Sequence, residues 1–160
     1  MESLFNQPPH SPGVQPGAVP PRTVRTVLLI DDSDDDEFFL RRSLIKSGIL
    51  ANLIRIPGGR EAIEYFSREG KYADTVLFPE SDLVFLDINM PSVSGFDVLT
   101  WLQTNQPVNA PFVVVLSSSE EFRDKAQAKK LGARSYASKP TSGNFFADLA
   151  NELGLVWVKK

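Results

Sequence analysis

The sequence contains no cysteine, and its single histidine, His10, lies in a segment rich in proline. Without cysteine the chain cannot form disulfide bonds, thiol nucleophiles or zinc–thiolate sites. One histidine in such a segment also argues against a catalytic histidine or a metal site built from several histidines. No apolar run approaches the about 20 residues that a membrane-spanning helix needs, and residues 1–5 lack the features of a secretory signal. We therefore expect a cytoplasmic protein that does not enter a membrane.

The formal net charge of −3 conceals an uneven distribution of acidic side chains. Six of the 20 acidic residues lie between Asp31 and Glu37, whereas the 17 lysines and arginines are scattered. Carboxylates this close repel one another, so the cluster indicates either a bound cation or a solvated helix start, and Ser33 and Asp36 have the spacing of a capping box. The basic residues are not interleaved with aromatic ones, and we expect no direct binding of nucleic acid.

The length of 160 residues is typical of one domain with a hydrophobic core. Residues 1–23 hold half of the 12 prolines and show no periodicity, so we interpret them as a disordered tail. Residues 24–155 form the predicted domain. Residues 156–160 form a short C-terminal tail, in which Val156-Trp157-Val158 is expected to dock on the domain.

Five short apolar runs alternate with segments of helical periodicity, and this alternation is typical of an α/β protein. Right-handed crossovers then favour a flavodoxin-like, doubly wound (βα)5 fold with a parallel sheet in the order 2-1-3-4-5. The fourth helix has a thin apolar stripe, on which we expect Phe122, Ala126 and Leu131 to face inward. The predicted strands are residues 26–30, 52–56, 83–86, 112–116 and 135–138.

Polar side chains follow four of these predicted strands. Asp31-Asp32 follow the first strand and Asp87 the third, while Ser117 and Lys139 follow the fourth and fifth. Ligands of an open parallel sheet bind at the carboxyl ends of its strands, so we expect these groups to converge. Three carboxylates suit Mg²⁺, and a carboxylate beside such an ion can be a nucleophile toward a phosphoryl donor. Taken singly, each acid could be only a helix cap and the lysine only a solvated charge.

In order and spacing, these residues resemble the receiver domain of two-component response regulators over about residues 24–155. The resemblance includes the segment Leu86–Pro91 with Gly95, and Lys139-Pro140 near the end of the domain. It is greatest to single-domain regulators associated with phytochrome-type histidine kinases, which share the acid-rich first turn and the loop Tyr72-Ala73-Asp74. Each motif alone is weak, but their arrangement at successive strand ends is specific.

The resemblance implies a phosphoryl acceptor and a magnesium site. Asp87 would accept the phosphoryl group, and Lys139 would pair with it. Asp32 and Asp87 would hold Mg²⁺ together with the backbone carbonyl of Asn89, while Asp31 would act through water.

The resemblance also implies residues that respond to the phosphoryl group. Ser117 and Tyr136 occupy the switch positions. Asn89 and Ser119 occupy positions that tune the lifetime of the phosphate, and Lys139-Pro140 matches a junction with a cis peptide.

The implied function is a response regulator that is not an enzyme beyond its own phosphorylation and dephosphorylation. Its expected partners are a sensor histidine kinase, of the phytochrome type, or a histidine phosphotransfer protein. A homodimer through the face of the fourth helix, fifth strand and fifth helix is a further expectation. Because the sequence leaves no room for an output domain, we expect a stand-alone regulator that acts through protein contacts.

Two alternatives stay open from the sequence. The first is a receiver-like scaffold that acts without phosphorylation. The second is a Mg²⁺-dependent phosphohydrolase with an aspartyl nucleophile, but such enzymes usually carry a second acid two residues after it, where this chain has Asn89. A flavin-binding protein of this fold would need a hydroxyl-rich loop after the first strand. This chain has Asp31-Asp32 there, which argues against flavin binding.

Overall fold

The computed structural model describes residues 20–118, 121–139 and 144–160. Residues 1–19 of the predicted tail lie outside these ranges. The elements alternate along the chain as the periodicity predicts. In order they are β1 Arg22–Val24, β2 Thr26–Ile30, α1 Asp34–Lys46, β3 Asn52–Ile56, α2 Gly59–Ser67, the 3-10 helix η1 Gly70–Ala73, β4 Leu83–Leu86, α3 Gly95–Asn105, β5 Phe112–Ser117, α4 Phe122–Lys130, β6 Ser135–Ser138, α5 Phe145–Leu153 and β7 Leu155–Trp157.

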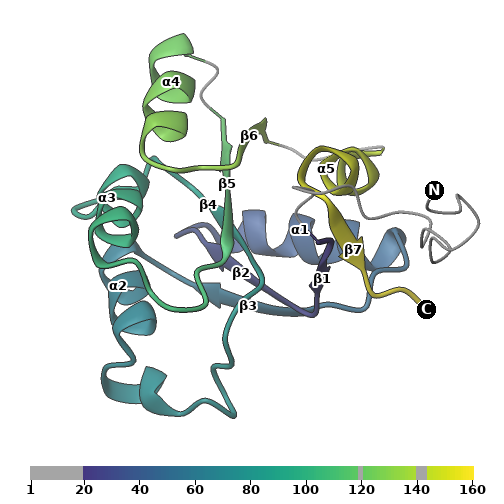
Figure 1. The fold of residues 1–160 in the computed structure, drawn as a ribbon, viewed down its shortest axis with the longest axis horizontal. Helices are drawn as coiled ribbons and strands as arrows, with labels where there is room; N and C mark the ends of the chain where they lie inside the picture. Colours follow the sequence, from purple (N-terminus) through teal and green to yellow (C-terminus); the bar gives the residue numbers. More distant parts are fainter. Residues whose placement is uncertain (1–19, 119–120, 140–143) are drawn as a thin grey trace, which may run out of the picture.

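The main sheet has five parallel strands in the order β3-β2-β4-β5-β6 (Figure 1). This order confirms the predicted 2-1-3-4-5 arrangement of a flavodoxin-like fold. It places β2 and β4 side by side at the centre of the sheet, with Ile30 opposite Leu86. The residues that follow these two strands therefore emerge next to each other.

Helices cover both faces of the sheet: α1 and α5 lie on one face, and α2, α3 and α4 lie on the other (Figure 1). Successive strand residues alternate between the two hydrophobic clusters, so Leu29 and Phe85 pack toward α1 and α5, while Leu28 and Val84 pack on the opposite side. All four side chains are fully buried. Burial of each such side chain contributes about 1.5–3 kcal/mol to folding, so both faces are needed for a stable sheet.

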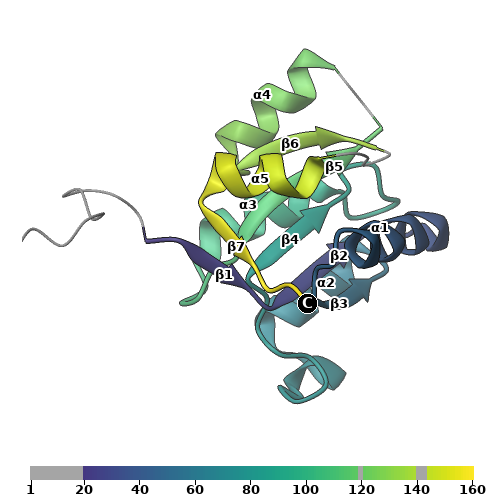
Figure 2. The ribbon, with the colours of Figure 1, turned by 90° about the vertical axis from the view of Figure 1, so that its right-hand side faces the viewer.

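A second, two-stranded sheet joins the two ends of the domain and was not predicted. Strand β7 pairs in parallel with β1 and lies beside α5 (Figure 2). Val24, Leu155 and Trp157 are buried, so the C-terminal segment docks on the domain as expected. Three-residue strands are too short for a periodicity to be recognised. Strand β1 begins at Arg22, so it extends the folded region two residues beyond the expected start.

Helix α4 differs from the prediction in the residue that it buries. Ala128 is buried, whereas Ala126 is exposed and Leu131, just after the helix, is half-buried. The side chain of Phe122 lies outside the described part of the structure. The expectation for Ala126 was wrong because small and charged residues give this helix little apolar periodicity to fix its rotation.

The helices of this fold are short. Among the described residues, none forms a helix long and apolar enough to cross a membrane.

Candidate functional site

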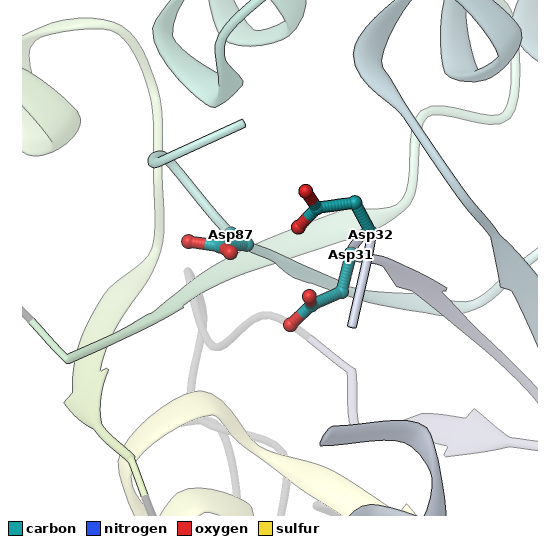
Figure 3. A group of neighbouring side chains, drawn as sticks. All are labelled: Asp31, Asp32 and Asp87. Carbon is teal, nitrogen blue, oxygen red and sulfur yellow. The ribbon is translucent and has the colours of Figure 1, made fainter. Parts of the chain in front are cut away.

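The three predicted acids meet at the carboxyl ends of β2 and β4. Asp31 and Asp32 directly follow Ile30, and the Asp87 amide donates a hydrogen bond to the Ile30 carbonyl at 2.9 Å. Carboxylate oxygens of Asp31, Asp32 and Asp87 lie within 4.8 Å of one another. Figure 3 shows the three side chains as neighbours, two from adjacent backbone positions and the third from the next strand. Asp31 and Asp87 are buried, whereas Asp32 is exposed.

The loop after β4 holds Asp87 in place. The Asn89 amide donates to Asp87 Oδ1 at 2.9 Å, which fixes one carboxylate oxygen. The loop then turns back against the start of α3, where Gly95 meets the backbone of Asp87. A Cβ atom at Gly95 would lie 2.4 Å from the Asp87 carbonyl oxygen and 2.7 Å from Ile88 Cα. The approach is therefore possible only because residue 95 has no side chain.

Lys139 reaches the same cluster from the end of β6. Its Nζ lies 2.7 Å from Asp31 Oδ2 and 3.3 Å from Asp87 Oδ2. Its backbone amide donates to the Ser117 carbonyl at 2.9 Å, so the neighbouring strands β5 and β6 fix where its side chain begins. The side chain is 15% exposed. The ammonium thus supplies counter-charge to the carboxylates from a partly buried position.

Burial and the charges of neighbouring groups have opposite effects on the pKa values of Asp31 and Lys139. Burial raises the pKa of Asp31 to about 6, although hydrogen bonds from Lys139 and from the Ser33 amide limit the rise. Burial by itself would lower the pKa of Lys139, but its hydrogen bonds to Asp31 and Asp36 outweigh this effect and raise it. Lys139 is therefore protonated at neutral pH and stabilises the ionised form of its partners.

Asp36 is a further member of the cluster that sequence reasoning assigned to a capping box. The Ser33 hydroxyl does accept a hydrogen bond from the Asp36 amide, at 3.2 Å, which caps α1. The Asp36 carboxylate, however, accepts a hydrogen bond from Lys139 Nζ at 2.5 Å. Hydrogen bonds from Lys139 and its neighbours outweigh the effect of burial and lower the pKa of Asp36. Among the helices that the structure describes, α3 has the full capping box, between Ser94 and Asp97.

The two predicted switch residues lie on the neighbouring strands β5 and β6, where Tyr136 pairs with Val115, two residues before Ser117. Ser117 is fully buried, and its hydroxyl accepts a hydrogen bond from Asn89 Nδ2 at 3.3 Å. Tyr136 is half-buried and packs against the cluster beneath α2, α3 and α4, with Lys125 Nζ 5.8 Å from its ring centroid. Ser119 and Pro140 lie outside the described residues.

An open cavity of about 530 Å³ gives access to Asp87, Asn89 and Lys139. Its polar lining comes from Asp36, Asp87, Asn89, Ser118 and Lys139. Phe39, Leu40 and Leu116 add apolar surface to the lining. The cavity is of the size of a small-molecule site, and Asp87 forms part of its lining.

The donor atoms of the cluster fit a hard divalent cation. Mg²⁺ binds carboxylate and carbonyl oxygens and usually retains several waters. Asp31, Asp32 and Asp87 supply such oxygens, and the exposure of Asp32 leaves room for waters. With Asp36 the cluster has four carboxylates, and Lys139, which contacts three of them, is the one ammonium that the described residues place among them, so the site is short of positive charge. This imbalance favours a cation at the three acids.

Comparison with known proteins relates this site to one family. Residues 27–150 match the family described as the response regulator receiver domain. Response regulator Rcp1 of Synechocystis sp. is 29% identical over 115 residues, which cover 72% of this chain and 76% of Rcp1. Its Mn(2+)-bound crystal structure has a TM-score of 0.65 at 26% identity and covers 78% of this chain and 88% of that chain. This chain spans less than half the length of several other curated relatives.

Two further solved structures are similar over most of both chains. The bacteriophytochrome response regulator AtBRR has a TM-score of 0.72 at 27% identity and covers 84% of this chain and 96% of its own. The phosphorylated cyanobacterial phytochrome response regulator RcpA has a TM-score of 0.65 at 27% identity, with coverages of 82% and 90%. Because the family match spans most of the chain and includes Asp31, Asp32, Asp87 and Lys139, the chain belongs to the response regulator receiver domain family of signalling domains.

Proposed function

We propose that this protein accepts a phosphoryl group on Asp87 from a partner histidine kinase or a histidine phosphotransfer protein, and signals through protein contacts. The observation that carries the proposal is the placement of Asp87. Its carboxylate is buried beside two other acids and a lysine, in the lining of a cavity open to solvent. A carboxylate in this setting is shielded from solvent yet reachable by a phosphoryl donor.

The proposed transfer uses groups that the fold already holds in place. One oxygen of Asp87 attacks phosphorus, the bond from phosphorus to the imidazole nitrogen breaks, and the nitrogen keeps the electron pair. Asp87 Oδ1 is held by the Asn89 amide, which leaves Oδ2, beside Lys139, as the attacking atom. Lys139 and the Ser117 hydroxyl would donate to the phosphoryl oxygens, where charge develops during transfer.

Mg²⁺ is the cofactor that we assign to Asp31, Asp32, Asp87 and the carbonyl of Asn89. When bound it would neutralise charge on the phosphoryl oxygens. Asp31 is held by the Ser33 amide and Lys139, so its role through water is consistent with its engaged oxygens. The manganese-bound form of the similar protein Rcp1 supports a divalent ion in this setting.

A signal would follow from the added charge. A phosphoryl group brings about −1.5 to −2 charges to the site. Ser117 would turn toward the new oxygens and give up its contact with Asn89. Tyr136 would then repack, which would change the face formed by α4, β6 and α5.

The partners follow from the same similarity. AtBRR and RcpA are regulators of phytochrome systems by name, so we expect a phytochrome-type histidine kinase as the phosphoryl donor. A homodimer through α4, β6 and α5 is the second expectation. Sedimentation with and without beryllofluoride tests it, since a monomer in both conditions would rule out this dimer.

A phosphoryl-transfer assay separates this function from a scaffold that never carries phosphate. The protein is incubated with acetyl phosphate and Mg²⁺, and its intact mass is measured. We expect a gain of one phosphoryl group in the wild-type protein and in Asp148→Asn, an exposed acid on α5. The gain should disappear in Asp87→Asn and with a chelator. No gain in any sample would favour the scaffold, and steady release of inorganic phosphate with rapid turnover would favour a phosphohydrolase.

A further inference from the structure

We infer that Asp36 is a positioning residue that competes with Asp87 for Lys139 and thereby slows phosphoryl transfer onto Asp87. This inference rests on the proposed function, because it concerns the lysine that would stabilise the transferred group. Asp36 lies in the first turn of α1, in the wall of the same cavity as Asp87 and Lys139.

The three contacts of the Lys139 ammonium are unequal. It lies 2.5 Å from Asp36 Oδ2 and 2.7 Å from Asp31 Oδ2, but 3.3 Å from Asp87 Oδ2. Charge-assisted hydrogen bonds between nitrogen and oxygen are usually 2.7–2.9 Å long, so the contact with Asp87 is the weakest of the three. Of the three N–H donors of the ammonium, two form hydrogen bonds with Asp36 and Asp31, whereas Asp87 is only within ion-pair distance. The lysine is therefore held toward α1 and away from the phosphoryl acceptor.

Lys139 does not depend on Asp36 for its place in the site. Its backbone amide is bound to the Ser117 carbonyl at 2.9 Å, and Asp31 holds the ammonium independently. Asp36 is fixed in turn by its own helix, since its amide donates to the Ser33 hydroxyl. A change at Asp87 would leave Asp36 where it is, so Asp36 acts as a fixed competitor for a mobile ammonium.

Neighbouring acids of α1 cannot take over this role. Asp34 and Glu37 both form ion pairs with Arg55 of β3, on the side of the helix away from Lys139. Asp35 is exposed. Asp36 is thus the acid in the first turn of α1 whose carboxylate contacts Lys139. To approach a phosphoryl oxygen on Asp87, the Lys139 ammonium must move away from Asp36, with which it makes the shortest of its three contacts.

The test compares Asp36→Asn with Asp35→Asn. Both variants remove one negative charge from the first turn of α1, but in the described structure only Asp36 of the two contacts Lys139. Phosphorylation by acetyl phosphate is followed at saturating Mg²⁺, so that a change in cation affinity does not enter. We expect Asp36→Asn to be about threefold to tenfold faster than Asp35→Asn, the factor that corresponds to the net contribution of a typical intramolecular hydrogen bond. Asp36→Glu, which restores the charge, should return the rate to within about twofold of wild type.

A second readout reports on the lysine itself. The nitrogen resonance of Lys139 Nζ should shift in Asp36→Asn and stay unchanged in Asp35→Asn, with equal melting temperatures showing that both variants fold. Equal rates in the two variants, or a slower rate in Asp36→Asn, would overturn the inference while wild-type labelling preserved the proposed function. A wild-type protein that acquires no phosphoryl group would overturn both.

Discussion

Gly95, the first residue of α3, lies so close to the carbonyl oxygen of Asp87 that a residue with a side chain does not fit at this position. A Cβ at Gly95 would approach that oxygen to 2.4 Å, and the neighbouring atom is backbone that cannot rotate away. The position of the phosphoryl acceptor is therefore fixed partly by a residue that carries no functional group.

Gly95→Ala should destabilise the protein by about 2–4 kcal/mol, because either the loop after β4 or the start of α3 must move. Gly48→Ala is the matched control, since a Cβ there meets nothing within 4 Å and only its φ of +70° opposes the change. We expect this control to cost about 1 kcal/mol. Chemical denaturation measures both, and equal losses would show that the contact at Gly95 is not tight.

Tyr65 gives the unfolding free energy a dependence on alkaline pH. The residue is buried, its hydroxyl donates to the Pro79 carbonyl at 2.6 Å, and burial raises its pKa above 10. The unfolded chain loses this proton near pH 10 while the folded chain retains it, so stability is complete below pH 10 and falls as pH rises through the folded pKa.

In Tyr65→Phe the decline of stability above pH 10 should be shallower than in wild type. The variant should lose about 1 kcal/mol at pH 8 from the missing hydrogen bond. Denaturation at a series of pH values tests both statements, and parallel curves for the two proteins would contradict the assignment to Tyr65.

The sequence made the acids and the lysine of the site visible because each follows a recognisable strand. Asp36 was not recognised, because an acid in the first turn of a helix is already explained by the helix dipole and by a serine cap. Only the position of Lys139, which comes from a strand about a hundred residues later, shows the second role. A contact of that kind has no local pattern in the sequence.

Among the elements, the five strands of the main sheet were predictable, whereas the rotation of α4 and the pairing of β1 with β7 were not. Strands β2, β4 and β5 are buried on both faces and appear as unbroken apolar runs. Helix α4 buries only one small residue, Ala128, of those whose side chains are described, so its rotation could not be read from periodicity. The pairing of β1 with β7 depends on contacts between the two ends of the domain, which no local segment encodes.

Strand β7 is held by one aromatic side chain. Trp157 is buried, its ring contacts Phe146 edge-on at 5.5 Å, and its indole nitrogen donates to the Phe146 carbonyl at 2.8 Å. Trp101, the other tryptophan, is half-buried and stacks on Phe66.

Trp157→Ala should cost about 3–5 kcal/mol, whereas Trp101→Ala should cost less because its ring is only partly removed from water. Hydrogen exchange should also show faster exchange of the amides of β1 and β7 in Trp157→Ala. Equal losses in the two variants would indicate that β7 contributes little to the stability of the domain.

In the whole molecule, the site exists only when the sheet is complete. Its groups come from the ends of β2, β4, β5 and β6 and from the start of α1, and the parallel order of the strands brings them to one edge. A cation that binds this edge therefore binds the folded chain alone, so binding and stability are linked.

Mg²⁺ should raise the melting temperature of the wild-type protein. At about 100 times the dissociation constant the gain is about 2.7 kcal/mol, or about 5–10 °C for a chain of this size. Asp32→Asn should lose most of this gain without being unstable in the absence of Mg²⁺, because Asp32 is exposed. An equal rise in both proteins would place the cation elsewhere.

The account as a whole depends on one carboxylate, and a site-resolved measurement tests it most directly. After reaction with acetyl phosphate and Mg²⁺, borohydride reduces an aspartyl phosphate to homoserine, and peptide mass spectrometry then locates the modified residue. We predict homoserine at position 87 and at no other acid of the cluster. Modification of Asp31, Asp32 or Asp36 in its place, or none at any of the four, would contradict the assignment of Asp87 as the phosphoryl acceptor.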